Sequence, residues 1–400
     1  MSNPKQPNVF YMGVFDLAQN DGKSINEREV IRKILELNPN ARYFGPKPSK
    51  ELLGFPLKQM IFHRPKRGIV SDIRLQLWFM REVTKAIQSV DGPTVVITRA
   101  HYLSFAPIII KKRTGVPMIN KEAGIPNWFY AGHQRTPIGL RNLLVWLRKK
   151  NILSADRNWC VTEVIAEHWK KAGNLSDERV FVQPNGVNID MFNAAAEPQF
   201  PSGVTKPRDI NILYAGNLHH SGVPELVQAL PGLAALGYDV GVIAAGDGEQ
   251  REEIECLARE HCVEDRVTIL GWLPYDTMPS LYARCDILAA VYDQEFLDTN
   301  GFRSQKIYQY LGAGRAVIAG RCPEHDFVEE YGFGWMTDPH DTDEMVKVIA
   351  SIIDDPALMQ RDSARSQWAE ETASYDAVAR NILKHVGDLS AAATPIAMKR

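Results

Sequence analysis

Apolar residues in the first half of the chain fall in short runs that alternate with amphipathic stretches. The polar segment 16–24 is predicted to be the loop between the first strand and the first helix. Strands are predicted at five apolar runs: 9–15, 94–98, 116–120, 159–162 and 179–182. Helices are predicted between them, at 26–37, from Phe105 onward and at 163–171. Such alternation predicts a parallel sheet with helices on both faces.

The second half repeats this pattern after a segment without periodicity, 193–208, which is typical of an interdomain linker. A last helix is predicted at 375–386, and the Ala-rich tail 390–400 is expected to fray. Strands are predicted at 210–215, 240–245, 267–270, 287–291 and 316–319. We therefore predict an N-terminal domain at 1–192, a C-terminal domain at 205–370, and a helix at 371–390 that returns to the first domain.

The composition is that of a globular α/β protein. The chain has 400 residues, of which 45% are hydrophobic and 24% are charged, and this length favours two domains. No apolar run reaches the roughly 18 residues of a membrane span, and 1–7 lacks the apolar stretch of a signal peptide. We therefore expect a cytoplasmic protein. The five cysteines form no C-x-x-C pair, so we interpret them as reduced thiols of the core.

Charge is divided unevenly along the chain. Residues 1–190 contain 29 Lys and Arg against 16 Asp and Glu, and the remainder contains 17 against 32. The formal charges of the two parts are therefore +13 and −15. A basic half can face phosphates or anionic lipid, whereas no nucleic-acid-binding motif accompanies the charge.

Two stretches concentrate this basic charge. The segment 55–67 mixes aromatic and basic residues, and 137–150 is predicted to be an amphipathic cationic helix. Such a helix can lie in a lipid headgroup layer through Arg148, Lys149 and Lys150, and the protein would then be peripheral on the inner face of the membrane. A helix that packs its apolar face on the core is equally consistent with the pattern.

Three glycine-containing turns follow predicted strands of the second half. They are Gly216 to Gly222, Gly246 to Gly248, and the segment 270–273. Ligands of open parallel sheets bind at the carboxyl ends of the strands, where all three turns would gather. Each turn is also consistent with tight packing alone.

The segment 300–319 carries the strongest signal in the sequence. Ser304 is predicted to be the N-cap of a helix that ends at Gly312 or Gly314. Lys306 would lie in the first turn beside free amides, and Gln309 one turn further along the same face. That face could hold a diphosphate and its ribose, although surface Lys and Gln are also common without any such role.

At this point the sequence resembles the retaining glycosyltransferases of family 4, which have the GT-B fold. The resemblance covers 205–355 and extends back to 155–162 and 182–192. It implies an α/β protein of two Rossmann-like domains whose parallel sheets face a central cleft. The N-terminal domain would bind an acceptor and the C-terminal domain a nucleotide diphosphate sugar.

The resemblance also implies a donor site. Its members are Gly216, Asn217, Gly248, Trp272, Leu273, Gly301, Phe302, Arg303, Ser304, Lys306 and Gln309. Lys306 would contact the diphosphate, Trp272 and Leu273 would frame the base, and the loop 300–303 would offer amides to the sugar. Gln309 stands where the family usually has a glutamate that binds the ribose, and an amide oxygen can still accept a hydrogen bond.

Three positions depart from the family pattern. Asn217 and Ser221 replace a usual arginine and lysine, and Gly301 replaces a glutamate that binds the donor sugar. Substitutes for the lost cations are Lys306, Arg303 and Lys23. The sugar contact would come from Glu295 or Asp298.

Candidates for acceptor chemistry follow strands of the first half. Asp16, His101 and Glu122 could each orient an acceptor hydroxyl or act as a base, and the sequence does not choose among them. The resulting prediction is a retaining, metal-independent hexosyltransferase without a cofactor. Its donor would be a UDP- or GDP-linked sugar, and its acceptor a lipid-linked or saccharide molecule of cell-surface polysaccharide or glycolipid synthesis. Open alternatives are an inactive nucleotide-sugar-binding protein and a nucleotide-sugar epimerase.

Overall fold

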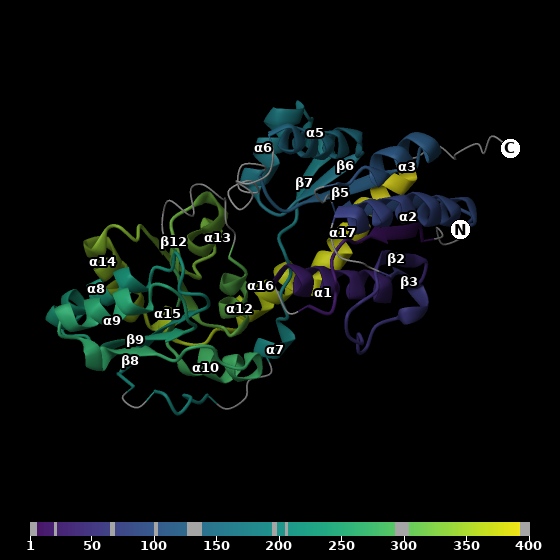
Figure 1. Ribbon diagram of the computed structural model, residues 1–400. Helices are drawn as coiled ribbons and strands as arrows, with labels where there is room; N and C mark the ends of the chain where they lie inside the picture. The colour runs from purple at the N-terminus through teal and green to yellow at the C-terminus, as the bar shows by residue number, and fades with distance from the viewer. Residues whose placement is uncertain are drawn as a thin grey trace. The chain divides into compact units, whose positions relative to one another are not determined.

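The computed structural model divides the chain into two compact units, which are described separately (Figure 1). Unit 1 comprises Met1–Gly186 and Tyr375–Arg400, and unit 2 comprises Val187–Ser374. The structure describes residues 6–19, 22–64, 69–99, 103–125, 138–193, 198–204, 207–292 and 304–392. Each unit contains one sheet, and every strand pairing in both sheets is parallel. The predicted α/β fold class is therefore confirmed.

The sheet of unit 1 has seven strands in the order β3-β2-β1-β4-β5-β6-β7. These are β1 (Asn8–Met12), β2 (Ala41–Pro46), β3 (Met60–His63), β4 (Thr94–Arg99), β5 (Met118–Glu122), β6 (Arg157–Cys160) and β7 (Val180–Val182). From β1 the chain proceeds to β2 and β3 on one side, then returns to β4 on the other side of β1. The carboxyl ends of β1 and β4 therefore flank the switch point of this sheet.

Helices cover both faces of this sheet. They are α1 (Gly22–Leu37), α2 (Ile69–Gln88), α3 (Ala106–Thr114), α5 (Ile138–Ser154), α6 (Glu163–Gly173) and α17 (Tyr375–Ala392). Because side chains alternate along a strand, Val9 and Tyr11 pack in the core beneath α1 and α17. Phe10 and Met12 point to the other face and pack beneath α2 and α3. The C-terminal helix α17 lies beside α1 and belongs to unit 1 (Figure 1).

The sheet of unit 2 has six strands in the order β10-β9-β8-β11-β12-β13. These are β8 (Ile210–Ala215), β9 (Val240–Ala245), β10 (Val267–Ile269), β11 (Ile287–Ala290), β12 (Ala316–Gly320) and β13 (Gly334–Thr337). Its helices are α7 (Asp190–Asn193), α8 (Val223–Ala235), α9 (Arg251–Glu260), α10 (Met278–Arg284), α12 (Gln305–Gly312), α13 (Phe327–Glu330), α14 (Thr342–Ile353), α15 (Pro356–Met359) and α16 (Ser363–Ala373). Short 3-10 turns lie at Leu57–Gln59, Asp177–Arg179, Glu264–Arg266, Tyr275–Thr277 and Pro323–His325.

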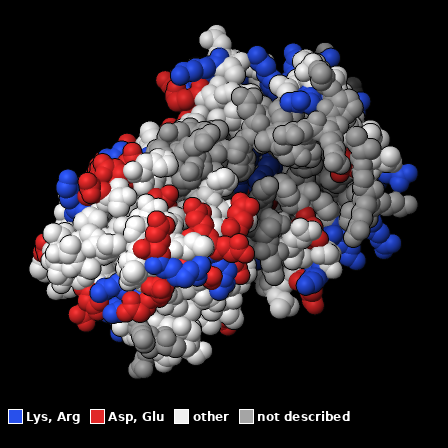
Figure 2. Space-filling model, turned by 60° about the vertical axis from the view of Figure 1, so that its left-hand side comes forward, with Lys and Arg blue, Asp and Glu red and all other residues white. Residues whose placement is uncertain are grey.

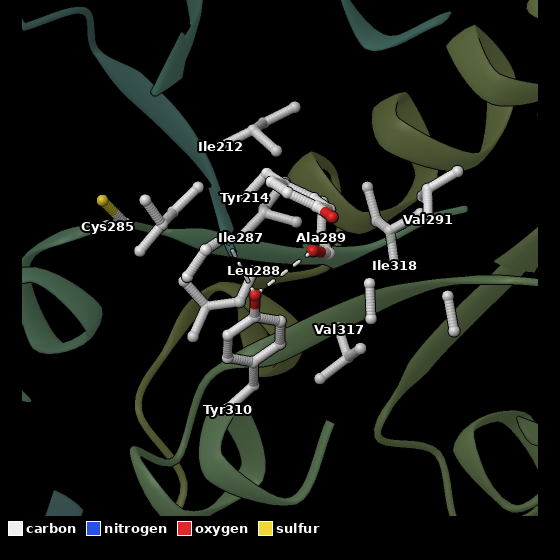
Figure 3. Close-up of a cluster of buried hydrophobic side chains, with 14 of the residues drawn as sticks. Ile212, Tyr214, Cys285, Ile287, Leu288, Ala289, Val291, Tyr310, Val317 and Ile318 are labelled. Carbon is white, nitrogen blue, oxygen red and sulfur yellow. Dashed lines mark hydrogen bonds between the residues drawn. The ribbon is translucent and has the colours of Figure 1, made fainter. Parts of the chain in front are cut away.

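A buried tyrosine fixes α12 against the centre of this sheet. Tyr310 is fully buried, and its hydroxyl donates to the Ala289 carbonyl at 3.3 Å and accepts from the Ala215 amide at 3.2 Å (Figure 3). Ala215 ends β8 and Ala289 lies in β11, so one hydroxyl joins the helix to two neighbouring strands. This bond determines where the first turn of α12 lies.

Several elements differ from their predicted extent. The structure adds β2, β3, β13 and the long helix α2, none of which was predicted. The prediction that a frayed tail begins at Ser390 is wrong, because α17 continues to Ala392. The described part of the chain contains no helix that is both long enough and apolar enough to cross a membrane.

The prediction that all cysteines belong to the core is wrong for two of them. Cys160, Cys285 and Cys322 are buried, whereas Cys256 and Cys262 are exposed. Cys262 also has a left-handed backbone, with φ of 54°. On the face shown in Figure 2, acidic side chains gather on one part of the surface and Lys and Arg lie mostly on other parts.

Candidate functional site

The strand order of unit 2 defines a switch point between β8 and β11. From β8 the chain proceeds outward to β9 and β10, and it then returns to the other side of β8 to form β11, β12 and β13. The loops that follow β8 and β11 therefore diverge at the same edge of the sheet. In open parallel sheets, ligands bind in the crevice that such a divergence creates.

Lys306 lies across this switch point. Its Nζ is 4.4 Å from the centre of the Tyr214 ring and 5.1 Å from that of Tyr292, and it donates to the Tyr214 hydroxyl at 3.3 Å. Tyr214 belongs to β8, and Tyr292 follows the end of β11. The ammonium group is thus held between the ends of the two diverging strands.

The surroundings of this ammonium group disfavour its charge. Burial lowers the pKa of Lys306 to about 7, because two aromatic rings replace most of its water. Within the described part of the chain, no carboxylate raises that pKa again. Burial also raises the pKa of both Tyr214 and Tyr292, so these phenols stay neutral near pH 7. An anionic ligand would supply the missing counter-charge.

Gly216, directly after β8, leaves room for the Lys306 side chain. Its φ of 143° is one that L-residues rarely adopt, and a Cβ there would lie 2.2 Å from Nζ of Lys306. The glycines after β9 have another reason. A Cβ at Gly246 would lie 1.7 Å from the Gly216 carbonyl oxygen, and one at Gly248 would lie 2.6 Å from the Leu218 backbone. Packing between the two loops accounts for these two glycines.

Hydrogen bonds between those loops also account for Ser221 and Asn217. The Ser221 side chain is buried, and its hydroxyl and amide both donate to Gln250 Oε1 at 2.8 Å. The Asn217 carbonyl accepts from the Tyr214 hydroxyl at 3.0 Å. Ser221, which replaces the family's lysine, therefore serves packing between loops.

The start of α12 differs in one respect from its prediction. Ser304 has the extended backbone of an N-cap, but its side chain makes no capping bond, so the predicted capping role of that side chain is wrong. Its hydroxyl instead shares a hydrogen bond of 2.7 Å with Tyr292, and its amide donates to His325 Nε2 at 3.5 Å. The Ser304 side chain therefore does not cap the leading amides of the helix.

Gln309 lies one turn after Lys306, within a group of tyrosines. Its Nε2 donates to the Tyr275 hydroxyl at 3.2 Å, and its Oε1 accepts from the Tyr282 hydroxyl at 3.3 Å. Each end of the amide keeps capacity for one more hydrogen bond. Trp272 is 67% exposed and Leu273 is half-buried, so the Trp272 ring is accessible.

Other predicted site residues fall outside the described part of the chain. These are Gly301, Phe302, Arg303, Glu295, Asp298 and His101, together with the side chain of Lys23. The described part contains no group of three or more His, Cys, Asp or Glu residues that could hold a metal ion.

The two acidic candidates of unit 1 are engaged in local contacts. Asp16 accepts from the amides of Ala18 at 3.0 Å and Ser49 at 3.1 Å. Partial burial would raise the pKa of Asp16, but hydrogen bonds from Ser49 and the Ala18 amide outweigh it and lower the pKa. Glu122 accepts from Arg148 at 2.9 Å and 2.5 Å. Both carboxylates thus hold loops in place.

Sequence reasoning missed an ionic cluster at the switch point of unit 1. Glu27 of α1 is fully buried and accepts from Arg99 at 2.6 Å and Lys121 at 3.1 Å, while the Tyr11 hydroxyl donates to its other oxygen. Burial opposes its charge, but Lys121 and Arg99 lower the pKa of Glu27 to about 2. Burial lowers the pKa of Lys121 to about 8. Apolar periodicity marks α1 as a helix but gives no signal for this pairing.

Residues 209–355 match the protein family described as Glycosyl transferases group 1. One relative is the phosphatidylinositol N-acetylglucosaminyltransferase of Arabidopsis thaliana, of which one component chain is 26% identical over 33% of this chain and 28% of its own length. Alpha-D-kanosaminyltransferase of Streptomyces kanamyceticus is 22% identical over 64% of this chain and 67% of its own length. The resemblance predicted from the sequence is thereby confirmed.

Solved structures share the fold of both units. Sucrose-phosphate synthase from Thermosynechococcus elongatus has a TM-score of 0.65 at 18% identity, covering 97% of this chain and 100% of that chain. HepE of Anabaena in complex with UDP has a TM-score of 0.64 at 16% identity, covering 95% and 100%. These likenesses identify the fold as GT-B.

Proposed function

We propose, on the premise that residues 209–355 form a group 1 glycosyltransferase region, that this chain is a retaining hexosyltransferase that requires no metal ion. Its donor is a UDP- or GDP-linked sugar, and its acceptor is a lipid-linked or saccharide molecule in cell-surface polysaccharide or glycolipid synthesis. Unit 2 binds the donor and unit 1 the acceptor. The protein acts on the cytoplasmic side of the membrane as a peripheral protein.

One observation supports this proposal most strongly. The ammonium group of Lys306 lies at the switch point of unit 2, over Tyr214 and Tyr292, without a carboxylate partner in the described part of the chain. The leading amides of α12 lie on the same turn and are not capped by Ser304. A lysine beside the amides of a helix N-terminus suits a diphosphate, because both supply positive charge to its oxygens.

The chemistry of transfer places its largest electrostatic demand at this position. As the bond between sugar and diphosphate breaks, negative charge grows on the leaving oxygen. Lys306 and the helix amides would stabilise that charge more strongly in the transition state than in the bound donor. The diphosphate would in turn help to take the acceptor proton, so no separate base from Asp16 or Glu122 is required.

The choice of donor and acceptor draws on similar proteins. HepE of Anabaena is solved with UDP, which favours UDP as the first probe. Gln309 is then the ribose contact and Trp272 a stacking surface for the base. The two curated relatives are named for transfer of N-acetylglucosamine with phosphatidylinositol and for transfer of kanosamine, which leaves both a lipid and a saccharide acceptor in the proposal.

Replacing Lys306 by Ala tests the proposed donor site. We expect turnover with the cognate donor to fall about 10²- to 10³-fold, as for loss of one charged contact in a transition state. Lys347→Ala is a matched control, because this exposed lysine lies on α14 of the same unit. Equal turnover by the Lys306→Ala protein and the parent would refute the assigned role.

A product assay separates the alternatives. The full-length chain is incubated with a panel of UDP- and GDP-sugars, with and without saccharide and polyprenyl-phosphate acceptors. Transfer or donor hydrolysis supports the glycosyltransferase. Interconversion of donors without an acceptor would favour an epimerase, and donor binding without any turnover would favour an inactive binding protein.

A further inference from the structure

Exposed apolar side chains in the helices of unit 1 gather on two of them. Val70, Ile73 and Leu77 of α2 are 57%, 40% and 53% exposed, and Leu143 and Trp146 of α5 are 46% and 54% exposed. No other helix described in unit 1 carries a large hydrophobic residue of comparable exposure. Isolated exposed hydrophobics are ordinary, whereas such a concentration is typical of an interaction surface.

On each helix these residues form a stripe along one side. Val70, Ile73 and Leu77 follow the spacing i, i+3, i+7, so they share one face of α2. Arg74 and Arg81 are exposed on the same face. The opposite face of α2, with Leu75, Phe79 and Val83, is buried in the core.

The stripe on α5 has the same spacing and a similar composition. Leu143, Trp146 and Lys150 stand at i, i+3, i+7, and Lys150 Nζ lies 5.8 Å from the centre of the Trp146 ring. Lys149 is exposed beside them. Arg148 does not belong to this surface, because Glu122 and the Gly124 carbonyl hold its guanidinium. The expectation that Arg148 contacts lipid headgroups is therefore wrong.

Both stripes lie on the same face of the sheet. The connections β3 to β4 and β5 to β6 run in the same direction across the sheet, and right-handed crossovers place α2 and α5 on the same side. The helix α3 lies between them, in contact with both. It ends with Lys111, Lys112 and Arg113.

Charge distinguishes this face from the opposite one. The helices α2, α3 and α5 together carry ten Lys and Arg and two Asp and Glu. On the other face, α1 and α17 carry six and five. The positive charge of the first half is therefore concentrated beside the exposed apolar stripes.

We propose that α2 and α5 dock unit 1 onto an anionic lipid bilayer. Ile73, Leu77 and Trp146 enter the boundary between headgroups and acyl chains, and Arg74, Arg81 and Lys150 contact the phosphates. Aliphatic residues, a tryptophan and cations along one helix side suit this boundary, where apolar groups sink and charged groups stay wet. A second copy of the chain would bring like charges together, and a nucleic acid would leave the aliphatic residues without partners.

This inference deepens the proposed function, since it rests on a membrane-bound acceptor only for its biological purpose. It names the surface and the lipid charge, which can be measured without any donor. Vesicle partition of the full-length protein is therefore the test, with donor binding followed separately by thermal shift in the absence of vesicles. Loss of donor binding would contradict the proposed function and leave the docking surface standing.

The experiment compares vesicles of phosphatidylcholine with vesicles that contain about one third phosphatidylglycerol. The parent should partition onto the anionic vesicles and not onto the neutral ones. The double variant Arg74→Gln/Arg81→Gln should partition about 10- to 30-fold more weakly, and salt should weaken binding of the parent. The double variant Ile73→Ser/Leu77→Ser should lose roughly tenfold or more.

Two matched controls keep the result specific. Arg380→Gln/Lys384→Gln removes two exposed cations from α17, and Leu236→Ser removes a residue of unit 2 that is 58% exposed. Both should bind vesicles like the parent, and circular dichroism should show every variant folded. Equal partition by the α2 variants and the parent, or equal binding to neutral vesicles, would overturn the proposal. Self-association or nucleic-acid binding that depends on the α2 stripe, without vesicle binding, would also overturn it.

Discussion

Binding of a nucleotide diphosphate should depend on pH through Lys306. Burial lowers the pKa of this lysine to about 7 in the free protein. A bound diphosphate would favour the charged ammonium and raise the pKa, so binding takes up a proton. Affinity should therefore be highest below about pH 7 and should fall as the pH rises above that value.

The expected magnitude follows from the same value. With a pKa of about 7, about nine tenths of Lys306 is protonated at about pH 6 and only about one hundredth at about pH 9. Affinity should approach a tenfold loss per pH unit above about pH 7.5, until the contact is lost. A hydrogen bond to a charged group contributes about 1.5–3 kcal/mol, so the total loss should be about ten- to a hundredfold. Tyr214 and Tyr292 add no titration in this range, because burial raises the pKa of each.

Isothermal titration calorimetry with UDP-glucose as the probe measures this dependence. Both phosphates of a nucleotide sugar keep their charge throughout the range, so the protein is responsible for any slope. Two buffers of different ionisation enthalpy should also reveal proton uptake near pH 7. Lys306→Arg is the control, because arginine stays charged and its affinity should not vary with pH. A flat profile for the parent, or the same slope for the Arg variant, would refute the reasoning.

Three other substitutions test contacts in both units. Gly216→Ala should abolish donor binding and destabilise unit 2 by about 1–3 kcal/mol in chemical denaturation, because φ is 143° and a Cβ would collide with the lysine ammonium; unchanged binding would contradict the geometry. Arg148→Ala should destabilise the protein by about 3–5 kcal/mol, because it leaves buried Glu122 without its cationic partner. Lys149→Ala should leave the melting temperature unchanged, and equal losses would contradict the pairing. The pKa of Glu27, lowered to about 2, contributes stability that is present above its unfolded pKa and is lost as the pH falls toward 2; Glu27→Gln should flatten this acid limb of urea unfolding, and an unchanged limb would exclude the cluster as its cause.

The sequence predicted the central strands of unit 2 most accurately. The runs 210–215 and 240–245 coincide with β8 and β9 because these strands are buried on both faces and are apolar throughout. The sequence of β2, Ala41–Pro46, contains Arg42, Gly45 and a proline, so its composition hides it. α2 was missed because the basic segment before it drew attention to charge.

Long-range pairing could not be read from the sequence. Glu27 meets Arg99 and Lys121 across 72 and 94 residues of chain. No spacing rule reaches that distance, because the pairing depends on which strands become neighbours. Local rules also fail where a tertiary partner competes, as for the Ser304 hydroxyl, which bonds to Tyr292 instead of the helix amides.

The helix face containing Lys306 was predicted from the sequence, whereas its surroundings were not. Spacing places Lys306 and Tyr310 one turn apart on one face. The sequence does not show that Tyr310 bonds to both strands at the switch point, nor that Tyr214 and Tyr292 enclose the ammonium group. These contacts depend on β11 returning beside β8.

A crystal structure of the full-length chain with UDP is the most direct test of the central claim. The account predicts that the diphosphate lies at the start of α12, with a β-phosphate oxygen within about 3 Å of Lys306 Nζ and the leading amides of the helix directed at it. UDP bound elsewhere, or bound with its diphosphate turned away from this lysine, would contradict the account.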